Sequence, residues 1–150
     1  MLGFETGVFE TRHGDYLIST DREKLDFAAI HRFLATESYW AQGMDPALLR
    51  RGIDNSLPFA AYDASGALAG FCRVVTDGTL FAYLRDVFVL ARHRGTGLGR
   101  AITRAALDHP DLAGMKNWTL ATRDAHGVYA ALGFRPVPDP TMYMQKKETP

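Results

Sequence analysis

The chain is short of cysteine, net charge and long apolar runs, and each shortage excludes a class of protein. Its 150 residues include one cysteine, Cys72, which rules out a disulfide framework within the chain and suits the reducing cytoplasm. Lysine plus arginine and aspartate plus glutamate each total 17, so the zero net charge favours neither nucleic acid nor an anionic membrane as a partner. No apolar run reaches the roughly 18 residues that a membrane-spanning helix needs. We therefore expect a cytoplasmic protein with no nucleic-acid partner and no membrane partner.

Leader peptides and metal sites are also missing from the pattern. The first residues, Met1–Glu5, have neither the basic stretch nor the apolar stretch of a signal peptide. No set of His, Cys and carboxylate residues has the spacing of a metal site, so no metal is expected. Cys72 lies in an apolar segment, which favours a buried structural thiol over a nucleophile. Without repeats or low-complexity tracts, residues 1–150 are expected to form one domain.

The spacing of apolar residues predicts a mixed α/β fold with the element order β-αα-βββ-α-β-α-ββ. Asp21 and the pair Asp45-Pro46 are typical helix starts, and residues 63–66 are typical of a hairpin turn. Residues 1–14 are expected to be irregular. Strands are predicted over residues 16–20, 56–63, 67–76, 79–90, 117–122, 134–137 and 141–146, and helices over 21–34, 46–53, 97–108 and 124–132.

A glycine-rich loop is the most informative feature of the sequence. Arg94-Gly95-Thr96-Gly97-Leu98-Gly99 follows an apolar strand and opens a helix. Glycines let the backbone turn tightly, and the amides of such a turn and of a helix start converge on an anion. Arg94 and Arg100 add positive charge. The alternative is a turn without a ligand. No Gly-Lys-Ser/Thr tripeptide of a P-loop follows, and Arg100 stands where a dinucleotide fingerprint needs glycine.

The sequence around this loop resembles the GNAT acetyltransferase superfamily. Arg94, Gly97 and Gly99 match its Arg/Gln-x-x-Gly-x-Gly/Ala signature, and residues 129–134 match its Tyr-x-x-x-Gly-Phe segment. The resemblance implies a mostly antiparallel sheet of six to seven strands flanked by four helices. It also implies direct transfer of an acetyl group from acetyl-CoA to a primary amine, and it is compatible with a homodimer. The first half of the chain resembles the family only in the order of its elements.

The resemblance also implies where the cofactor lies. The loop would hold the diphosphate, and a bulged strand would offer backbone amides to the pantetheine arm and the acetyl oxygen. The alternative for the strand is an ordinary buried strand. The cofactor-binding residues expected in this way are Val87, Phe88, Val89, Arg94, Gly95, Thr96, Gly97, Leu98, Gly99, Arg100 and Tyr129.

Tyr129 and Asp86 are the candidate catalytic residues. Tyr129 aligns with the family tyrosine near the CoA sulfur, where its phenol would protonate the leaving thiolate; the alternative is a core tyrosine. Asp86 would relay a proton through water or hold the amine, but a structural pairing with an arginine is equally compatible with the sequence. Polyamine-type relatives carry two acids here, and Arg85 replaces the first. Strand alternation predicts that Asp86 shares a face with Leu84 and Phe88.

The acceptor is expected to be a small-molecule amine that enters past Tyr39 and Trp40. These aromatic residues lie between the first two helices, in the segment that borders the acceptor site in the family, although packing alone would also explain them. His126 lies on the helical face of Tyr129, and a surface histidine is the simpler interpretation. Two other functions stay open: acetylation of a protein N-terminus or lysine, and a CoA-binding sensor domain without turnover.

Overall fold

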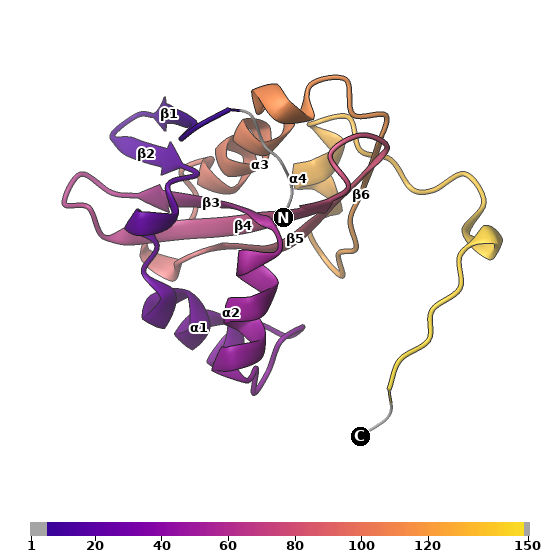
Figure 1. The fold of residues 1–150 in the computed structure, drawn as a ribbon, viewed down its shortest axis with the longest axis horizontal. Coiled ribbons are helices and arrows are strands. Elements are labelled where there is room, and N and C mark those ends of the chain that lie inside the picture. Colours follow the sequence, from indigo (N-terminus) through magenta and orange to yellow (C-terminus); the bar gives the residue numbers. More distant parts are fainter. Residues whose placement is uncertain (1–5, 149–150) are drawn as a thin grey trace.

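A six-stranded sheet forms the centre of the structure, a computed structural model that describes residues 6–148 (Figure 1). The spatial order follows the chain, β1-β2-β3-β4-β5-β6, and every neighbouring pair is antiparallel except the parallel pair β5 and β6. The expected mixed, mostly antiparallel sheet is therefore confirmed. The strands are β1 Glu10–His13, β2 Tyr16–Ser19, β3 Leu57–Tyr62, β4 Leu68–Thr76, β5 Phe81–Val89 and β6 Asn117–Thr119.

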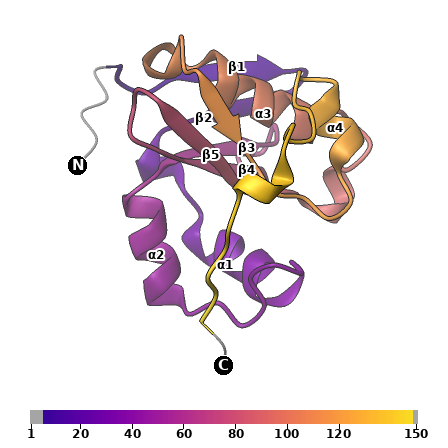
Figure 2. The same cartoon turned by 90° about the vertical axis from the view of Figure 1, so that its right-hand side faces the viewer.

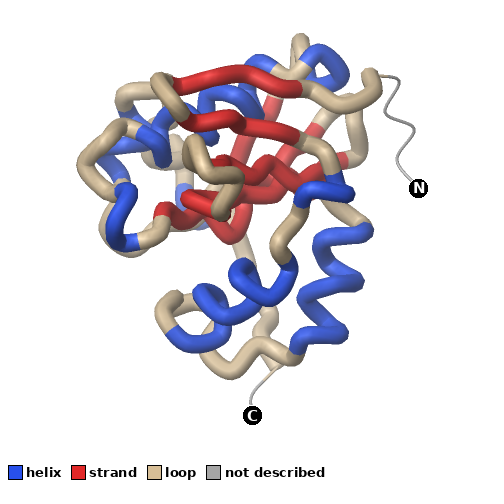
Figure 3. Tube along the Cα trace, turned by 90° about the vertical axis from the view of Figure 1, so that its left-hand side faces the viewer, coloured by secondary structure: helices blue, strands red, loops and turns tan. Residues whose placement is uncertain are grey.

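Helices cover both faces of the sheet, and the four expected helices are present (Figure 2). Two of them lie on one face, where the Asp26 and Asp45 side chains accept hydrogen bonds from the first backbone amides of each helix. The other two lie on the opposite face, as the tube drawing also shows (Figure 3). The first pair is α1 Phe27–Thr36 and α2 Pro46–Asp54, and the second pair is α3 Leu98–Asp108 and α4 His126–Ala130.

Two apolar cores lie between the sheet and its helices, one on each face of the sheet. On the α1/α2 face, the Phe88 ring stacks on Phe33 with 4.1 Å between centroids. On the α3 face, α3 packs so closely on β4 that a Cβ on Gly70 would lie 2.7 Å from Ile102 Cδ1. Glycine at this position therefore allows the close approach of helix and sheet.

Both ends of the chain differ from the sequence-based prediction. Residues 1–14 were expected to be irregular, but β1 forms there and pairs with β2 from Glu10↔Ser19 to His13↔Tyr16. The prediction failed because this edge strand has no apolar alternation and is stabilised by pairing. The helix expected over 21–34 is divided into a 3-10 turn, Arg22–Lys24, and α1. The absence of a leader was inferred from residues 1–5, which lie outside the described residues.

The two strands expected at the C-terminal end do not form in the described part of the chain. Residues 134–137 are irregular, and a 3-10 turn, Pro140–Met142, starts the second predicted segment. This part of the chain runs away from the body of the protein (Figure 1). A strand requires a partner to which it can hydrogen bond, and none of residues 6–148 provides one here.

Candidate active site

A bulge in β5 marks the centre of the candidate site. Phe71 pairs with Phe88 and Arg73 pairs with Arg85, so two residues of β5 lie opposite the single residue between Phe71 and Arg73 on β4. The bulged residue is Asp86, with φ 56°, the one non-glycine residue with positive φ among residues 6–148. Bulges of this kind bend the strand and disrupt the local ladder. The structure therefore contains the strand bulge that the family resemblance implied.

The bulge reverses the alternation of side chains along β5. Leu84 packs in the core on the α3 face, whereas Phe88 packs in the core on the α1/α2 face. The expectation that Asp86 shares a face with both of them is therefore wrong. Regular alternation holds only where the ladder is unbroken, and one extra residue shifts every later side chain to the other face.

Beyond the bulge, β5 and β6 separate. The two strands pair only from Phe81↔Asn117 to Tyr83↔Thr119. On the other side of β5, the Leu90 amide donates to the Ala69 carbonyl at 2.9 Å. Backbone groups of alternate residues in a strand point to opposite sides, so those of Val87 and Val89 point toward the side from which β6 is missing. An open edge thus leads along β5 toward the glycine loop.

The glycine loop follows this edge directly and begins α3. Gly95 and Gly97 have φ of 77° and 78°, and Gly97 precedes the first residue of α3 without a side-chain cap. The first amides of α3 are therefore not used by a capping side chain. The Arg94 Nε donates to the Val89 carbonyl at 3.1 Å, which holds the exposed Arg94 along the open edge.

The N-terminal hairpin of β1 and β2 supports the loop. His13 Nε2 lies 2.8 Å from the Thr96 carbonyl oxygen, and the Tyr16 hydroxyl lies 2.8 Å from His93 Nδ1. The sequence analysis did not predict either of these two contacts. Nothing in the local pattern indicates them, because they join residues about 80 positions apart.

Basic residues surround a hollow of about 590 Å³ between this hairpin and α3. Three arginines and a histidine line it, against one acid, Asp108. Such a lining favours an anion. The basic residues are Arg12, His13, Arg100 and Arg104, and Gly97 lines the same hollow.

Asp86 is buried in an ion pair. Only 6 % of the residue is exposed; Arg73 Nε donates to its Oδ2 at 2.6 Å, and Trp40 Nε1 donates to its Oδ1 at 2.9 Å. Arg73 also donates to the Gly52 carbonyl at 3.2 Å. These contacts connect the bulge of β5 to α2 and to the segment between α1 and α2. Sequence reasoning missed Arg73, which is 13 positions from its partner.

Tyr129 lies on α4, on the α3 side of the sheet, and is 9 % exposed. Burial raises its pKa to about 12, with smaller contributions from the neighbouring Cys72 and Tyr39. No hydrogen bond of its hydroxyl is found within residues 6–148, and its ring lies 6.0 Å from that of Phe134. The phenol thus stays protonated at physiological pH.

Cys72 is fully buried, and burial raises its pKa, so the thiol is inert.

Tyr39 and Trp40 lie beside the Asp86 bulge, in the segment between α1 and α2. Their rings meet edge to face at 5.0 Å, and both are partly exposed. The backbone N–H of Arg123 donates to the Tyr39 hydroxyl at 3.0 Å, and the Arg123 guanidinium lies 3.9 Å above the Tyr39 ring. Tyr39 therefore links the α1–α2 segment to the β6–α4 connection. Arg123 was not predicted as part of the site.

The remaining predicted residues divide between surface and core. His126 is exposed, and the side chain of Arg85 lies 3.9 Å from Asp86 while facing solvent. The side chains of Phe88 and Leu98 are buried in the two cores, so only their backbone is available for contact with a ligand. No group of three or more potential metal ligands occurs within residues 6–148. That same part of the chain has no helix both long and apolar enough to cross a membrane.

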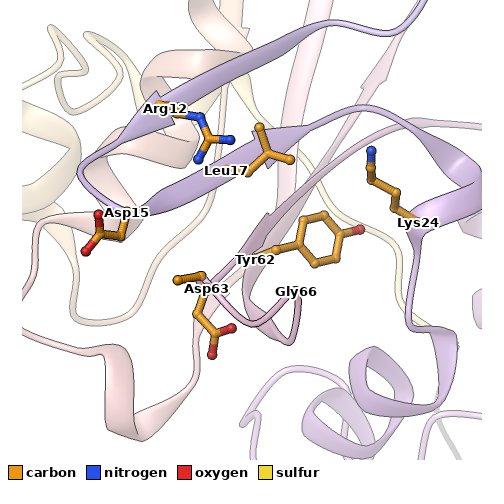
Figure 4. Close-up of a pocket in the computed structure, with 8 residues that line it drawn as sticks. Arg12, Asp15, Leu17, Lys24, Tyr62, Asp63 and Gly66 are labelled. Atoms are coloured by element: carbon orange, nitrogen blue, oxygen red, sulfur yellow. The ribbon is translucent and has the colours of Figure 1, made fainter.

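Another pocket, of about 360 Å³, has only Arg12 in common with the basic hollow (Figure 4). It shares no residue with the predicted site. Tyr62, from the end of β3, lies there between β2 and the turn that carries Lys24, and its buried hydroxyl has no hydrogen-bond partner among the described residues. The lining carries both charge signs: Arg12, Asp15, Leu17, Lys24, Tyr62, Asp63, Ala64 and Gly66.

Comparison with known proteins identifies the family. Residues 54–136 match the model of the acetyltransferase (GNAT) domain. The chain belongs to the GNAT family. A GNAT-family protein of Xanthomonas campestris pv. campestris has a crystal structure with a TM-score of 0.85 and 44 % identity, covering 89 % of this chain and 93 % of that one. Members of this family use acetyl-CoA as the acetyl donor.

Two further relatives limit what can be concluded from membership of the family. A protein of Gibberella zeae assigned as an acetyltransferase is 34 % identical over 105 residues, and the match spans 58 % of this chain and 59 % of that protein. The ribosomal-protein-S18-alanine N-acetyltransferase of Escherichia coli has a TM-score of 0.66 at 21 % identity, covering 80 % of this chain and 77 % of its own. The latter similarity shows the fold alone. Family membership thus places this chain among GNAT domains, and the curated relative is matched over only 59 % of its own length.

Proposed function

We propose that this GNAT protein transfers an acetyl group from acetyl-CoA directly to the primary amine of a small molecule. The observation that carries the proposal is the continuous line from the open edge of β5 into the glycine loop. The amides of Val87 and Val89, which no strand pairs within the described residues, lead to a turn whose two glycines have positive φ and to an uncapped helix start. An acyl group on a long thioester arm attached to a diphosphate fits such a line.

The residues that would hold acetyl-CoA are those of the loop and its support. The amides of residues 95–99 would receive the diphosphate. Arg94 uses its Nε for the Val89 carbonyl, which leaves its two terminal nitrogens for a phosphate. Arg100 lines the basic hollow beside the helix start and adds charge there. The backbone of Val87, Phe88 and Val89 would hold the arm. When bound, the thioester supplies the acetyl group.

Tyr129 is proposed as the general acid. Transfer forms an N–C bond and breaks a C–S bond, so the amine loses a proton and the leaving sulfur gains one. The phenol of Tyr129 is protonated at neutral pH and has no hydrogen bond within the described residues, so its proton is available to the leaving sulfur.

Asp86 is proposed to act on the acceptor side. Both of its oxygens accept hydrogen bonds, from Arg73 and Trp40, and the arginine offsets its charge. We infer that Asp86 orients Trp40 and holds the amine beside the β5 bulge, directly or through water. Tyr39 and Trp40 then form an aromatic wall, which favours a small acceptor over a long polypeptide.

An acceptor screen tests the proposal. Release of free CoA thiol from acetyl-CoA would be followed with a thiol reagent against polyamines, amino sugars, amino acids, arylalkylamines and peptides with free N-termini. The buried Cys72 adds little background to this assay. Turnover with small amines supports the proposal, and turnover with peptides alone would replace it by protein acetylation. Tight CoA binding without turnover on any amine would indicate a sensor domain.

A further inference from the structure

Two residues of the β1–β2 hairpin contact the glycine loop and the turn before it. His13 and Tyr16 pair directly across the hairpin, and their rings stack with 6.5 Å between centroids. His13 reaches the Thr96 carbonyl oxygen and Tyr16 reaches His93, both at 2.8 Å. The loop is therefore supported by a separate strand pair, at the edge of the sheet beside α3 (Figure 1).

The contact with His13 fixes the orientation of one peptide unit of the loop. A carbonyl oxygen can only accept, so His13 Nε2 carries a proton and donates it to Thr96. In a planar trans peptide, the C=O and the N–H of the following residue point in opposite directions. The Thr96 carbonyl therefore points toward the hairpin, and the Gly97 N–H points away from it.

No other contact in the described chain fixes this peptide unit. Gly95 and Gly97 flank Thr96, and glycine adopts their positive φ angles without steric cost. The Thr96 hydroxyl donates to the His93 carbonyl at 2.7 Å, which fixes the side chain of Thr96 rather than the peptide that follows it. Within residues 6–148, the amides of residues 95–100 donate to no acceptor. Without His13, the peptide could rotate and turn its carbonyl oxygen toward a bound anion.

We propose that His13 is a positioning residue for the diphosphate of acetyl-CoA. By holding the Thr96 carbonyl toward the hairpin, it keeps a partial negative charge away from the diphosphate and directs the Gly97 amide to it. The orientation is set before binding, so less ordering is required when the ligand binds. The inference rests on the proposed function, in which the amides of residues 95–99 receive the diphosphate.

Calorimetric titration with acetyl-CoA tests the role of His13 without an acceptor. His13→Leu removes the donor and should weaken binding about three- to tenfold, the usual net effect of one hydrogen bond. His13→Gln keeps an N–H donor on a side chain of similar reach and should restore most of the affinity. His31→Leu is the matched control: His31 Nε2, on α1, lies 2.7 Å from the Met44 carbonyl oxygen, and its loss should leave affinity unchanged. His13→Ala repeats the test if His13→Leu does not fold.

Dephospho-CoA separates positioning from direct contact with a phosphate. CoA and dephospho-CoA share the diphosphate, so His13→Leu should weaken the binding of both by the same factor. A loss confined to CoA would place His13 on the 3′-phosphate, in the basic hollow that His13 also lines, and would overturn the proposal. In steady state, the KM for acetyl-CoA should rise while kcat stays within about twofold, because only binding common to ground and transition states is lost.

The failure of this inference is distinguishable from the failure of the proposed function. If the wild type does not bind acetyl-CoA, both are wrong. If the wild type binds and Gly97→Val does not, the assignment of the loop stands by itself. In that case, wild-type affinity in His13→Leu, or equally weak binding in His13→Gln and His13→Leu, would show that His13 does not position the diphosphate.

Discussion

The proposed acid role of Tyr129 rests on one oxygen atom, and Tyr129→Phe removes that atom alone. The ring stays buried in the same core, beside Phe134. The hydroxyl makes no hydrogen bond within residues 6–148, so its loss leaves no described group unsatisfied. We therefore expect the variant to fold normally and to bind acetyl-CoA as the wild type does.

The expected loss lies in turnover. General acid–base catalysis typically contributes about 10²- to 10⁴-fold in rate. At about 1.36 kcal/mol per tenfold, this corresponds to roughly 2.7–5.4 kcal/mol of transition-state stabilisation. Because burial raises the pKa of Tyr129 to about 12, the acid stays protonated through the neutral range. The wild-type rate should accordingly show no decline from ionisation of Tyr129 below about pH 10.

The assay is kcat for CoA thiol release with the best acceptor, beside calorimetric acetyl-CoA affinity and a thermal melt. Tyr62→Phe is the matched control, since it removes another buried hydroxyl without a described partner, in a pocket that shares no residue with the predicted site. The control should keep full activity. A decrease of less than about threefold in Tyr129→Phe, with affinity and melting intact, would refute the acid role, because it falls well short of the general-acid range.

Three further predictions follow from the geometry. Gly97→Val should lower acetyl-CoA affinity by more than about tenfold in calorimetry. The control variant Gly114→Val, at a similar positive φ of 80°, should suffer the same backbone strain of about 1–3 kcal/mol but keep its acetyl-CoA affinity. Equal affinities of the two variants would contradict the assignment of the glycine loop to the diphosphate. Gly70→Ala should lose about 1–3 kcal/mol in urea unfolding, partly recovered by adding Ile102→Val, and a neutral result would exclude the predicted clash. Burial lowers the pKa of His109, so the unfolded chain binds a proton near pH 6.5 that the folded chain binds only at lower pH. Stability should thus fall as the pH drops below about 6.5, and His109→Gln should reduce that fall.

The sequence predicted most of the sheet and helices because their signals are local. Asp45-Pro46 starts α2, the 63–66 turn joins β3 to β4, and Gly97 precedes α3, as expected. The glycine loop and Tyr129 are predicted as site residues from local motifs. Arg73 and Arg123 were not predicted, because each contacts the candidate site through a residue far away in sequence.

The errors have a common physical origin in pairing between strands. β1 has little local strand signal and forms because β2 lies beside it. Residues 141–146 have a strong strand signal and remain unpaired in the described chain. Within β5, Asp86 was an available sign of an irregular strand, since aspartate is depleted in strands. Local preference indicates which segments suit a sheet, but a partner decides which of them form one.

Asp86 unites two unfavourable features that the fold alone does not require. A positive φ at a non-glycine residue costs on the order of 1–3 kcal/mol, and a glycine would avoid this cost. A buried ion pair such as Arg73–Asp86 is often no more stabilising than apolar residues of similar volume. Both features occur where β5 leaves β6, next to the amides of Val87 and Val89, which no strand pairs within residues 6–148. A fold selected for stability alone would avoid both, so their coincidence at this point supports the proposal that Asp86 shapes the site for its substrates.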